Sequence, residues 1–241
     1  MRTSTTAPPS RRRRVRTGLI AASSLCALTA LFAATAYVGL DPAAARVPLR
    51  EGAAIHYPLL LVHVVTSVLA LATVPLQLWP ALRRSGAHRV IGRIALFAGI
   101  LPGAVSGFGV ALLSGYGPVA QTGFAVLAVL WFTGAVAGYR AIRRGRRADH
   151  REWMVRVFAL TFAAVTLRLW IPVLMVLLSP ALGPVYGEES LFRGVYQTVA
   201  WLCWVPNLVI AEWYLRRSSA GRARAAASGA QRRGRGAGER G

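Results

Sequence analysis

The residues of this chain best suited to chemistry are its histidines and the arginines beside them. His88 opens the segment HRVIGR and His150 opens HREWMVR, and a long apolar run follows each segment. Imidazole is a common ligand of metals and haem iron. If the two segments lie on neighbouring helices at one membrane face, we expect His88 and His150 to be the two metal ligands of a haem b.

Arginines accompany both histidines at helical spacing. Arg89 and Arg93 are four residues apart, and Arg156 lies six residues after His150. Two like charges on one helix face repel unless an anion lies between them. A lipid phosphate or a haem propionate can supply that anion. Arg89, Arg93 and Arg156 are therefore predicted to contact the cofactor, with lipid headgroups as the alternative.

Arg168 and His63 lie within apolar runs, in TLRLW and LLLVHVVTS. Arg168 is about 14 residues from the end of its run, roughly 20 Å by helical rise, and no acid lies at the same depth. A buried charge is costly without a partner. Arg168 is expected to meet an anionic ligand, backbone carbonyls at a kink or water, or to reach the outer interface through a tilted helix. His63 can ligate haem, relay a proton or bond a neighbouring helix; His56 is predicted to be a surface residue.

The elements that position these residues are long apolar stretches. The chain has 241 residues and 25.8 kDa, with 55% hydrophobic residues, 15% charged residues and a mean hydropathy of +0.46. Six stretches can cross a hydrocarbon core of about 30 Å, and only helices satisfy their backbone in lipid. We predict an all-α polytopic transmembrane helix bundle with six spans: Thr17–Leu40, Pro58–Pro80, Ile91–Leu113, Val119–Ile142, Met154–Ser179 and Phe192–Leu215.

Glycines and prolines inside these spans carry structural expectations. Glycines at four-residue spacing let helix backbones approach closely, and each internal proline is expected to kink its span. The glycines are Gly99, Gly103, Gly107, Gly134 and Gly138, and the prolines are Pro75, Pro102, Pro172 and Pro206.

Arginine is distributed asymmetrically along the chain. All 29 basic residues are Arg, against 8 acids, for a net charge of +21, and 25 of them lie in the two tails and the links at residues 83–93 and 140–156. Because basic loops stay cytoplasmic, we predict a cell-membrane protein with both termini inside. A cleaved signal peptide ending at Ala34–Ala36 is the alternative for the first span.

The two tails, residues 1–16 and 216–241, are rich in Arg and small residues and are predicted to be disordered, flanking the six-helix domain at residues 17–215. Since the Arg residues lie between and beyond the apolar runs, not on a soluble domain, nucleic acid is a less suitable partner than the bilayer. We expect the tails and links to attract anionic lipid headgroups.

The sequence lacks the motifs of several classes of enzyme and transporter. The sequence holds no Gly-rich phosphate loop, no GxSxG, no HExxH and no paired carboxylates within a span. Cys26 and Cys203 lie in apolar runs without a CxxC partner, so a disulfide or zinc site is not indicated. The sequence leaves open whether the protein is an enzyme.

These residues resemble a known family, the bacterial predicted multi-pass membrane proteins of domain of unknown function 2306. The resemblance covers roughly Ile55 to Leu215, and it implies a multi-pass fold without an established activity. The residues that carry it are His63, Pro75-Leu76-Gln77, His88-Arg89-x-x-Gly92-Arg93, His150-Arg151-x-Trp153-Met154-x-Arg156 and Arg168.

A more distant similarity to two-haem transmembrane cytochromes b rests on helices that bear His near their ends, although the outer-side His pair is missing. Three functions follow from the sequence. The first is haem-based membrane electron transfer through His88 and His150. The second is binding or transport of an anionic small molecule or lipid by Arg168 and His63. The third is a structural or regulatory membrane partner.

Overall fold

The computed structural model describes residues 9–83 and 85–220, and within these residues all regular structure is helical. A further helix, residues 205–220, follows a turn at residues 203–204. The other elements are α1 (Pro9–Thr35), η1 (Pro42–Ala44), α2 (His56–Thr73), η2 (Pro75–Leu78), α3 (Pro80–Arg83), α4 (Ala87–Arg93), η3 (Ile94–Ile100), α5 (Leu101–Leu113), α6 (Pro118–Arg143), α7 (Arg147–Thr161), α8 (Ala163–Tyr186) and α9 (Glu188–Leu202).

Six helical stretches are long and apolar enough to cross a membrane, which confirms the predicted all-α bundle of six spans. The fifth combines α7 and α8, and the sixth combines α9 with the helix at residues 205–220. The spans are Arg13–Thr35, His56–Leu78, Ala87–Leu113, Pro118–Arg143, Arg147–Tyr186 and Glu188–Ala220.

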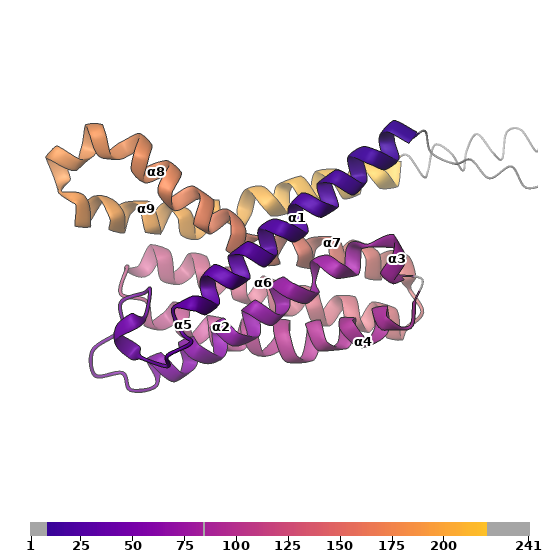
Figure 1. Cartoon of the computed structure of the whole chain (residues 1–241), viewed down its shortest axis with the longest axis horizontal. Coiled ribbons are helices and arrows are strands. Elements are labelled where there is room, and N and C mark those ends of the chain that lie inside the picture. Colours follow the sequence, from indigo (N-terminus) through magenta and orange to yellow (C-terminus); the bar gives the residue numbers. More distant parts are fainter. Residues whose placement is uncertain (1–8, 84, 221–241) are drawn as a thin grey trace, which may run out of the picture.

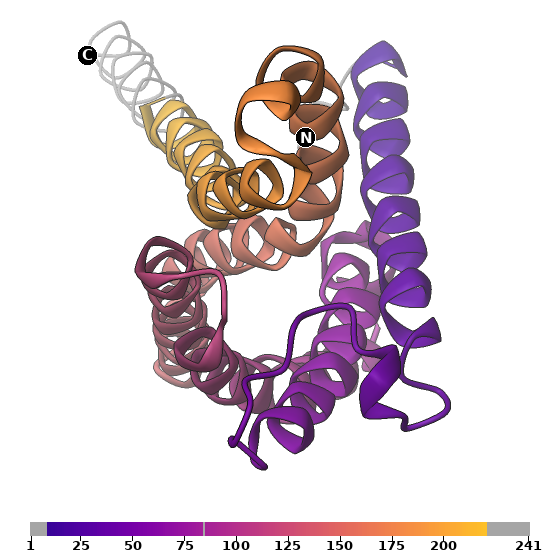
Figure 2. The same cartoon turned by 90° about the vertical axis from the view of Figure 1, so that its left-hand side faces the viewer.

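The helices follow one another around a central space, as the end-on view in Figure 2 shows. Spans that follow one another in the sequence pack together. Helix α1 contacts α2, α2 contacts α5 of the third span, and α5 contacts α6. Helix α6 then contacts both α7 and α9, and α8 contacts α9 and α1, which closes the circle. Buried core residues at this junction include Trp131, Ala135 and Val157.

The glycines inside the spans lie at close helix contacts, as the sequence predicted. A Cβ added to Gly99 would lie 3.1 Å from the backbone nitrogen of Ala70 on α2. A Cβ added to Gly138 of α6 would lie 3.2 Å from the Cβ of Trp153 on α7 and would overlap the Met154 side chain. These contacts leave no room for a larger residue, so the glycines set the helix spacing.

Three of the four prolines coincide with a change in helix type. Helix α2 gives way to the 3₁₀ turn η2 at Pro75, and the π-helical η3 directly precedes the turn that holds Pro102. Pro206 follows the break at residues 203–204. A proline cannot donate the helical hydrogen bond, and a π or 3₁₀ turn accommodates its ring. Pro172 instead lies inside α8, which continues through it.

Both tail boundaries differ from the sequence-based ones. Helix α1 begins at Pro9 and the last helix continues to residue 220, so the helices extend beyond the predicted bounds of the six-helix domain. Arginine is a good helix former, which lets a transmembrane helix extend into a basic flank. The rest of the predicted tails, residues 1–8 and 221–241, lies outside the described residues.

One end of the bundle is basic. The start of α1, the end of the last helix, α3 and the start of α4 lie together at this end in Figure 1. The link between α6 and α7, which carries Arg143, Arg144, Arg146 and Arg147, belongs to the same end. The opposite end holds the loop at residues 36–55, the turn at residues 114–117 and the turn between α8 and α9. Which end faces the cytoplasm stays a prediction.

Candidate functional site: an apolar cavity with His63 and Arg168

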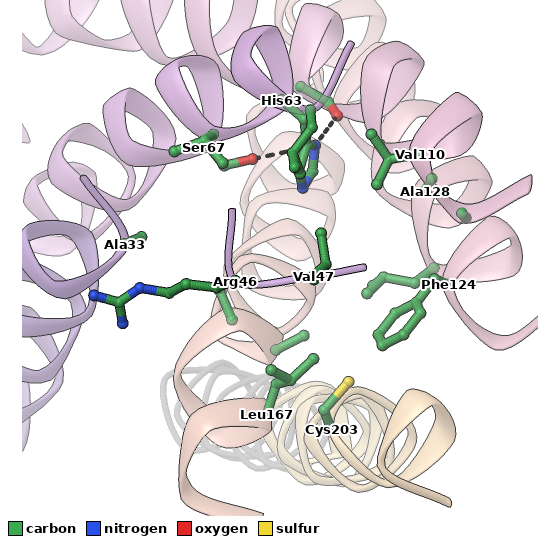
Figure 3. A pocket seen from close by; sticks show the side chains of 18 of the residues that line it. Ala33, Arg46, Val47, His63, Ser67, Val110, Phe124, Ala128, Leu167 and Cys203 are labelled. Atoms are coloured by element: carbon green, nitrogen blue, oxygen red, sulfur yellow. Dashed lines mark hydrogen bonds between the residues drawn. The ribbon is translucent and has the colours of Figure 1, made fainter. Parts of the chain in front are cut away.

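A cavity of about 370 Å³ lies among the spans, towards the opposite end from the basic one. Helices α1, α2, α5, α6, α8 and α9 contribute to its walls, together with residues 46–48 of the loop between α1 and α2. Most of the lining is aliphatic or aromatic. Figure 3 shows His63 and Ser67 on one wall and Leu167 and Cys203 on another. The two residues that the sequence proposed as a ligand-binding pair, His63 and Arg168, both line this cavity.

His63 is held in one orientation by helix α5. Its Nδ1 lies 2.9 Å from the carbonyl oxygen of Gly103 and 3.5 Å from Ser67 Oγ (Figure 3). Because a carbonyl only accepts, His63 Nδ1 carries the hydrogen of this bond. The ring can lie this close to α5 because residue 107 is a glycine. A Cβ at Gly107 would lie only 2.7 Å from Cε1 and Nδ1 of the ring. The neutral ring therefore keeps a bare Nε2.

Arg168 projects from α8 into surroundings that hold few acceptors. Its Nη1 donates to the carbonyl of Ala164 at 2.8 Å, and its Cζ lies 6.0 Å from the Phe32 ring centre. The ion pairs found within residues 9–83 and 85–220 do not include it. The predicted contact with a backbone carbonyl is present, but it engages one of the five N–H groups of a guanidinium.

His56 corrects a sequence-based prediction: it is not a surface residue but is 1% exposed, and it lines the same cavity. Its Nδ1 accepts a hydrogen bond of 2.9 Å from the backbone N–H of Arg50, so the loop folds over the start of α2. Nε2 then carries the ring hydrogen and is buried without a partner among the described residues. The seven-residue spacing from His63, two helical turns, is the signal that places both rings on one face.

An aromatic cluster forms the wall next to Arg168, and the sequence analysis did not single it out. Tyr196 of α9 lines the cavity, and its ring centre lies 4.0 Å from that of Tyr116 and 5.6 Å from that of Phe124. Gln197 fixes the neighbouring turn by donating to the Tyr116 carbonyl at 2.7 Å. Burial raises the pKa of the Tyr116 hydroxyl, which Arg193 partly opposes, so this phenol stays protonated at neutral pH.

The motif that begins at His88 makes a different kind of site, at the basic end. The Gln77 amide, oriented to satisfy both of its ends, donates from its nitrogen to the His88 carbonyl at 3.2 Å and to His88 Nδ1 at 2.7 Å. Its oxygen accepts from the Gly92 N–H at 3.2 Å. The side chain of Gln77 thus lies across the first turn of α4 and fastens η2 to it. Gly92 permits this approach, because a Cβ there would lie 3.3 Å from the end of the amide that, in this orientation, is the nitrogen.

The motif that begins at His150 makes an equivalent helix contact. His150 Nδ1 donates to the Gly138 carbonyl of α6 at 2.9 Å, which fastens α7 to the preceding span. His150 acts electrostatically on His88 across the two helices. Neither of them lines the cavity.

The predicted cofactor-binding arginines differ in their surroundings. Arg156 pairs with Glu212 of the last helix through two hydrogen bonds, one of them 3.1 Å from Nη2 to Oε2. Arg89 and Arg93 are exposed. Of the three, Arg156 therefore has an acidic partner within the protein, and contact of these arginines with a cofactor stays a prediction.

Haem does not fit the residues at the basic end as they are arranged. His88 Nδ1 accepts a hydrogen from Gln77, so the neutral ring carries its proton on Nε2, the nitrogen that would have to bind iron. Arg156 already has a carboxylate partner. Haem ligation by His88 and His150 stays an untested prediction.

Comparison with known proteins identifies the class of this membrane protein. The family described as "Predicted membrane protein (DUF2306)" matches residues 60–215, which cover more than half of the chain. The chain therefore belongs to this family, as the histidine and arginine motifs indicated. No curated protein and no solved structure matches it significantly.

Proposed function

We propose that this integral membrane protein of the DUF2306 family binds or carries an anionic small molecule or lipid in its cavity. Arg168 is the counter-ion and His63 lies beside the anion. The observation that carries the proposal is a guanidinium at an apolar cavity without a carboxylate within 4 Å in the part of the chain described. A charge so placed is costly, and a bound anion offsets that cost.

The size and lining of the cavity support a ligand with an apolar body. A volume of about 370 Å³ falls in the range of small-molecule sites, which combine apolar walls with a few polar groups. His56 adds a second polar group, because its Nε2–H is buried without a partner and belongs to the lining. Such an unpaired buried donor is itself unfavourable, so a ligand oxygen there would be stabilised.

The test compares three anionic ten-carbon ligands with a neutral one. Purified protein in lipid nanodiscs is titrated with decanoate, decanesulfonate, decyl phosphate and decanol. The expected result is that at least one of the anions binds at least tenfold more tightly than decanol, and that Arg168→Gln removes this preference. Arg193→Gln, which changes an exposed guanidinium bonded to the Gly115 carbonyl, is the matched control and should bind like wild type. Equal binding of decanol and all three anions, or an unchanged preference in Arg168→Gln, would overturn the proposal.

A separate proposal concerns the basic end. We propose that it faces the cytoplasm in the cell membrane and attracts anionic lipid headgroups. Its support is the clustering of exposed arginines, such as Arg89, Arg93, Arg143 and Arg144, at one end of the bundle. Positive charge is retained on the cytoplasmic side during insertion, and anionic lipid is abundant there.

A further inference from the structure

We infer that the cavity takes an apolar monocarboxylic acid and that His63 Nε2 shares one proton with it, so that binding of the carboxylate takes up one proton from solution. The inference rests on the proposed function and narrows it in two ways. It names the acid group, and it couples binding to protonation.

The first step is the state of the His63 ring. Its Nδ1–H is committed to the Gly103 carbonyl at 2.9 Å, and Gly107 leaves the ring no room to move towards α5. Nε2 of the neutral ring is therefore a lone pair at the cavity. A lone pair repels the oxygen of a carboxylate unless a proton lies between them. An anion that reaches both Arg168 and His63 must bring or acquire that proton.

The second step is the charge that faces His63 from the surrounding elements. Arg168 of α8 is close enough to act on the imidazole electrostatically. Around Arg168 lie two phenols, Tyr37 of the loop after α1 and Tyr196 of α9, and the guanidinium of Arg46 from the same loop. From α2 itself comes the Ser67 hydroxyl, and from α6 the Trp131 ring lines the cavity. Carboxylates are absent from the cavity lining among the described residues.

Arg46 does not add a free cation to the cavity. Its Cζ lies 3.7 Å from the Phe32 ring centre and its Nη2 donates to Thr35 Oγ1 at 3.0 Å, so the guanidinium is engaged by α1. In Figure 3 the side chain of Arg46 extends from the loop towards the helix that carries Ala33. Among the described residues that line the cavity, Arg168 is then the guanidinium whose hydrogen bond goes only to a carbonyl of its own helix, which matches an acid group with a single negative charge.

The proton balance follows directly. The carboxylate in water, one proton and the empty site become a bound carboxylic acid. Its O–H donates to His63 Nε2, and its carbonyl oxygen accepts from Arg168. The only bond that forms is the one between the proton and the carboxylate, so one proton is taken up per carboxylate bound.

A carboxylic acid meets this requirement and a stronger acid does not. The usual carboxyl pKa of about 4 is raised by burial in apolar surroundings, so a proton can be held near neutral pH. A sulfonate keeps its charge but does not hold a proton under these conditions. Both decanoate and decanesulfonate offer an anion and an apolar chain. Comparing them therefore distinguishes binding of any anion from binding that is coupled to proton uptake.

The experiment is titration calorimetry of the full chain in lipid nanodiscs at pH 7, in two buffers of different ionisation enthalpy. The difference in binding enthalpy gives the number of protons taken up. We expect about one proton per decanoate and none per decanesulfonate. The matched variant is His63→Asn, whose shorter amide can keep the bond to Gly103 but lacks an atom at the Nε2 position. It should bind decanoate about tenfold more weakly, the loss of one hydrogen bond, and without proton uptake.

Three results would overturn the inference. One is decanoate binding without proton uptake, and another is an undiminished proton count in a folded His63→Asn protein. The third is that decanoate and decanesulfonate bind with equal affinity, while both bind more tightly than decanol and Arg168→Gln removes this preference. That third result would leave the proposed function intact, whereas loss of the anion preference itself would remove both. A thermal melt of each variant shows whether it is folded.

Discussion

His63 Nδ1 lies 2.9 Å from the carbonyl oxygen of Gly103, one turn before Gly107 on α5. The same helix face therefore supplies both the acceptor that fixes the ring tautomer and the gap that the ring fills. The sequence predicted that Gly99, Gly103 and Gly107 form a packing surface. In the structure Gly103 and Gly107 also position the His63 side chain at the cavity. This dependence links helix packing to the chemistry of the site.

Gly107→Ala is expected to impair the site without touching a ligand-binding atom. The new Cβ would lie 2.7 Å from two atoms of the His63 ring, so the ring must shift away from Gly103. The cost is about 1–3 kcal/mol, as for other overpacked positions. We expect a lower melting temperature and weaker decanoate binding in nanodiscs.

Gly194→Ala is the control for this substitution. Gly194 lies in the middle of α9, and a Cβ there would meet no heavy atom within 4 Å. Alanine favours a helix over glycine, so stability should be equal or slightly higher and binding should not change. A Gly107→Ala protein that melts and binds like Gly194→Ala would contradict the assigned role of the gap.

The sequence anticipated the parts of this molecule that depend on apolar length and on residue size. The six spans follow from hydrocarbon thickness, and the closeness of α5 to α2 follows from the spacing of Gly99, Gly103 and Gly107. The cost of burying a polar group singled out His63 and Arg168 as candidates for a binding site. Their meeting in one cavity depends on how α2 and α8 are arranged around the bundle, which a local pattern does not encode.

Gln77→Leu should destabilise the connection between η2 and α4. The variant loses the bonds from the amide to the His88 carbonyl and ring and leaves the Gly92 N–H without the amide oxygen. We expect a loss of about 1–3 kcal/mol, the usual cost of a buried polar group left without its partner, measured as a lower melting temperature in nanodiscs. Thr133→Val, at an exposed hydroxyl bonded only within its own helix, should melt like wild type. Equal melting of both variants would show that the amide contributes no stability.

The pair Arg156–Glu212 joins α7 to the last helix, and its two side chains are 23% and 35% exposed. Glu212→Gln removes the charge of one partner while the guanidinium stays partly buried. The expected effect is a loss of about 1 kcal/mol, since solvent screens a pair at this exposure. The double variant Arg156→Gln/Glu212→Gln should recover part of that loss. A double variant as unstable as the sum of the two single variants would show that the pair is not coupled.

The spacing from His63 predicts the helix face of His56 but not its burial, and the partner of Arg156 is likewise beyond a local pattern. His56 stands in a polar stretch just before an apolar run, and its burial depends on the loop that folds back and donates from Arg50. Arg156 stood close to His150 in sequence, yet its partner is Glu212, 56 residues away. Both outcomes follow from long-range contacts, which no local pattern contains.

The haem hypothesis has a direct optical test. Protein expressed with haem precursor is purified, and a reduced-minus-oxidised visible spectrum is recorded. Because Gln77 bonds His88 Nδ1 and Arg156 bonds Glu212, we expect no sharp α band from ligation by His88 and His150. A sharp band that disappears in both His88→Ala and His150→Ala would establish the haem site. It would also show that Gln77 releases His88 when haem is bound.

The orientation of the bundle can be tested with single cysteines. Cys26 and Cys203 are buried and should not react with a membrane-impermeant maleimide. Ala54 and Ser85 are exposed, at the opposite end and at the basic end respectively. If the positive end faces the cytoplasm, intact cells should label Ala54→Cys strongly, while Ser85→Cys should be labelled only after the membrane is permeabilised. Labelling of Ser85→Cys in intact cells, with Ala54→Cys protected, would reverse the orientation and would place the loop that contributes residues 46–48 to the cavity on the cytoplasmic side.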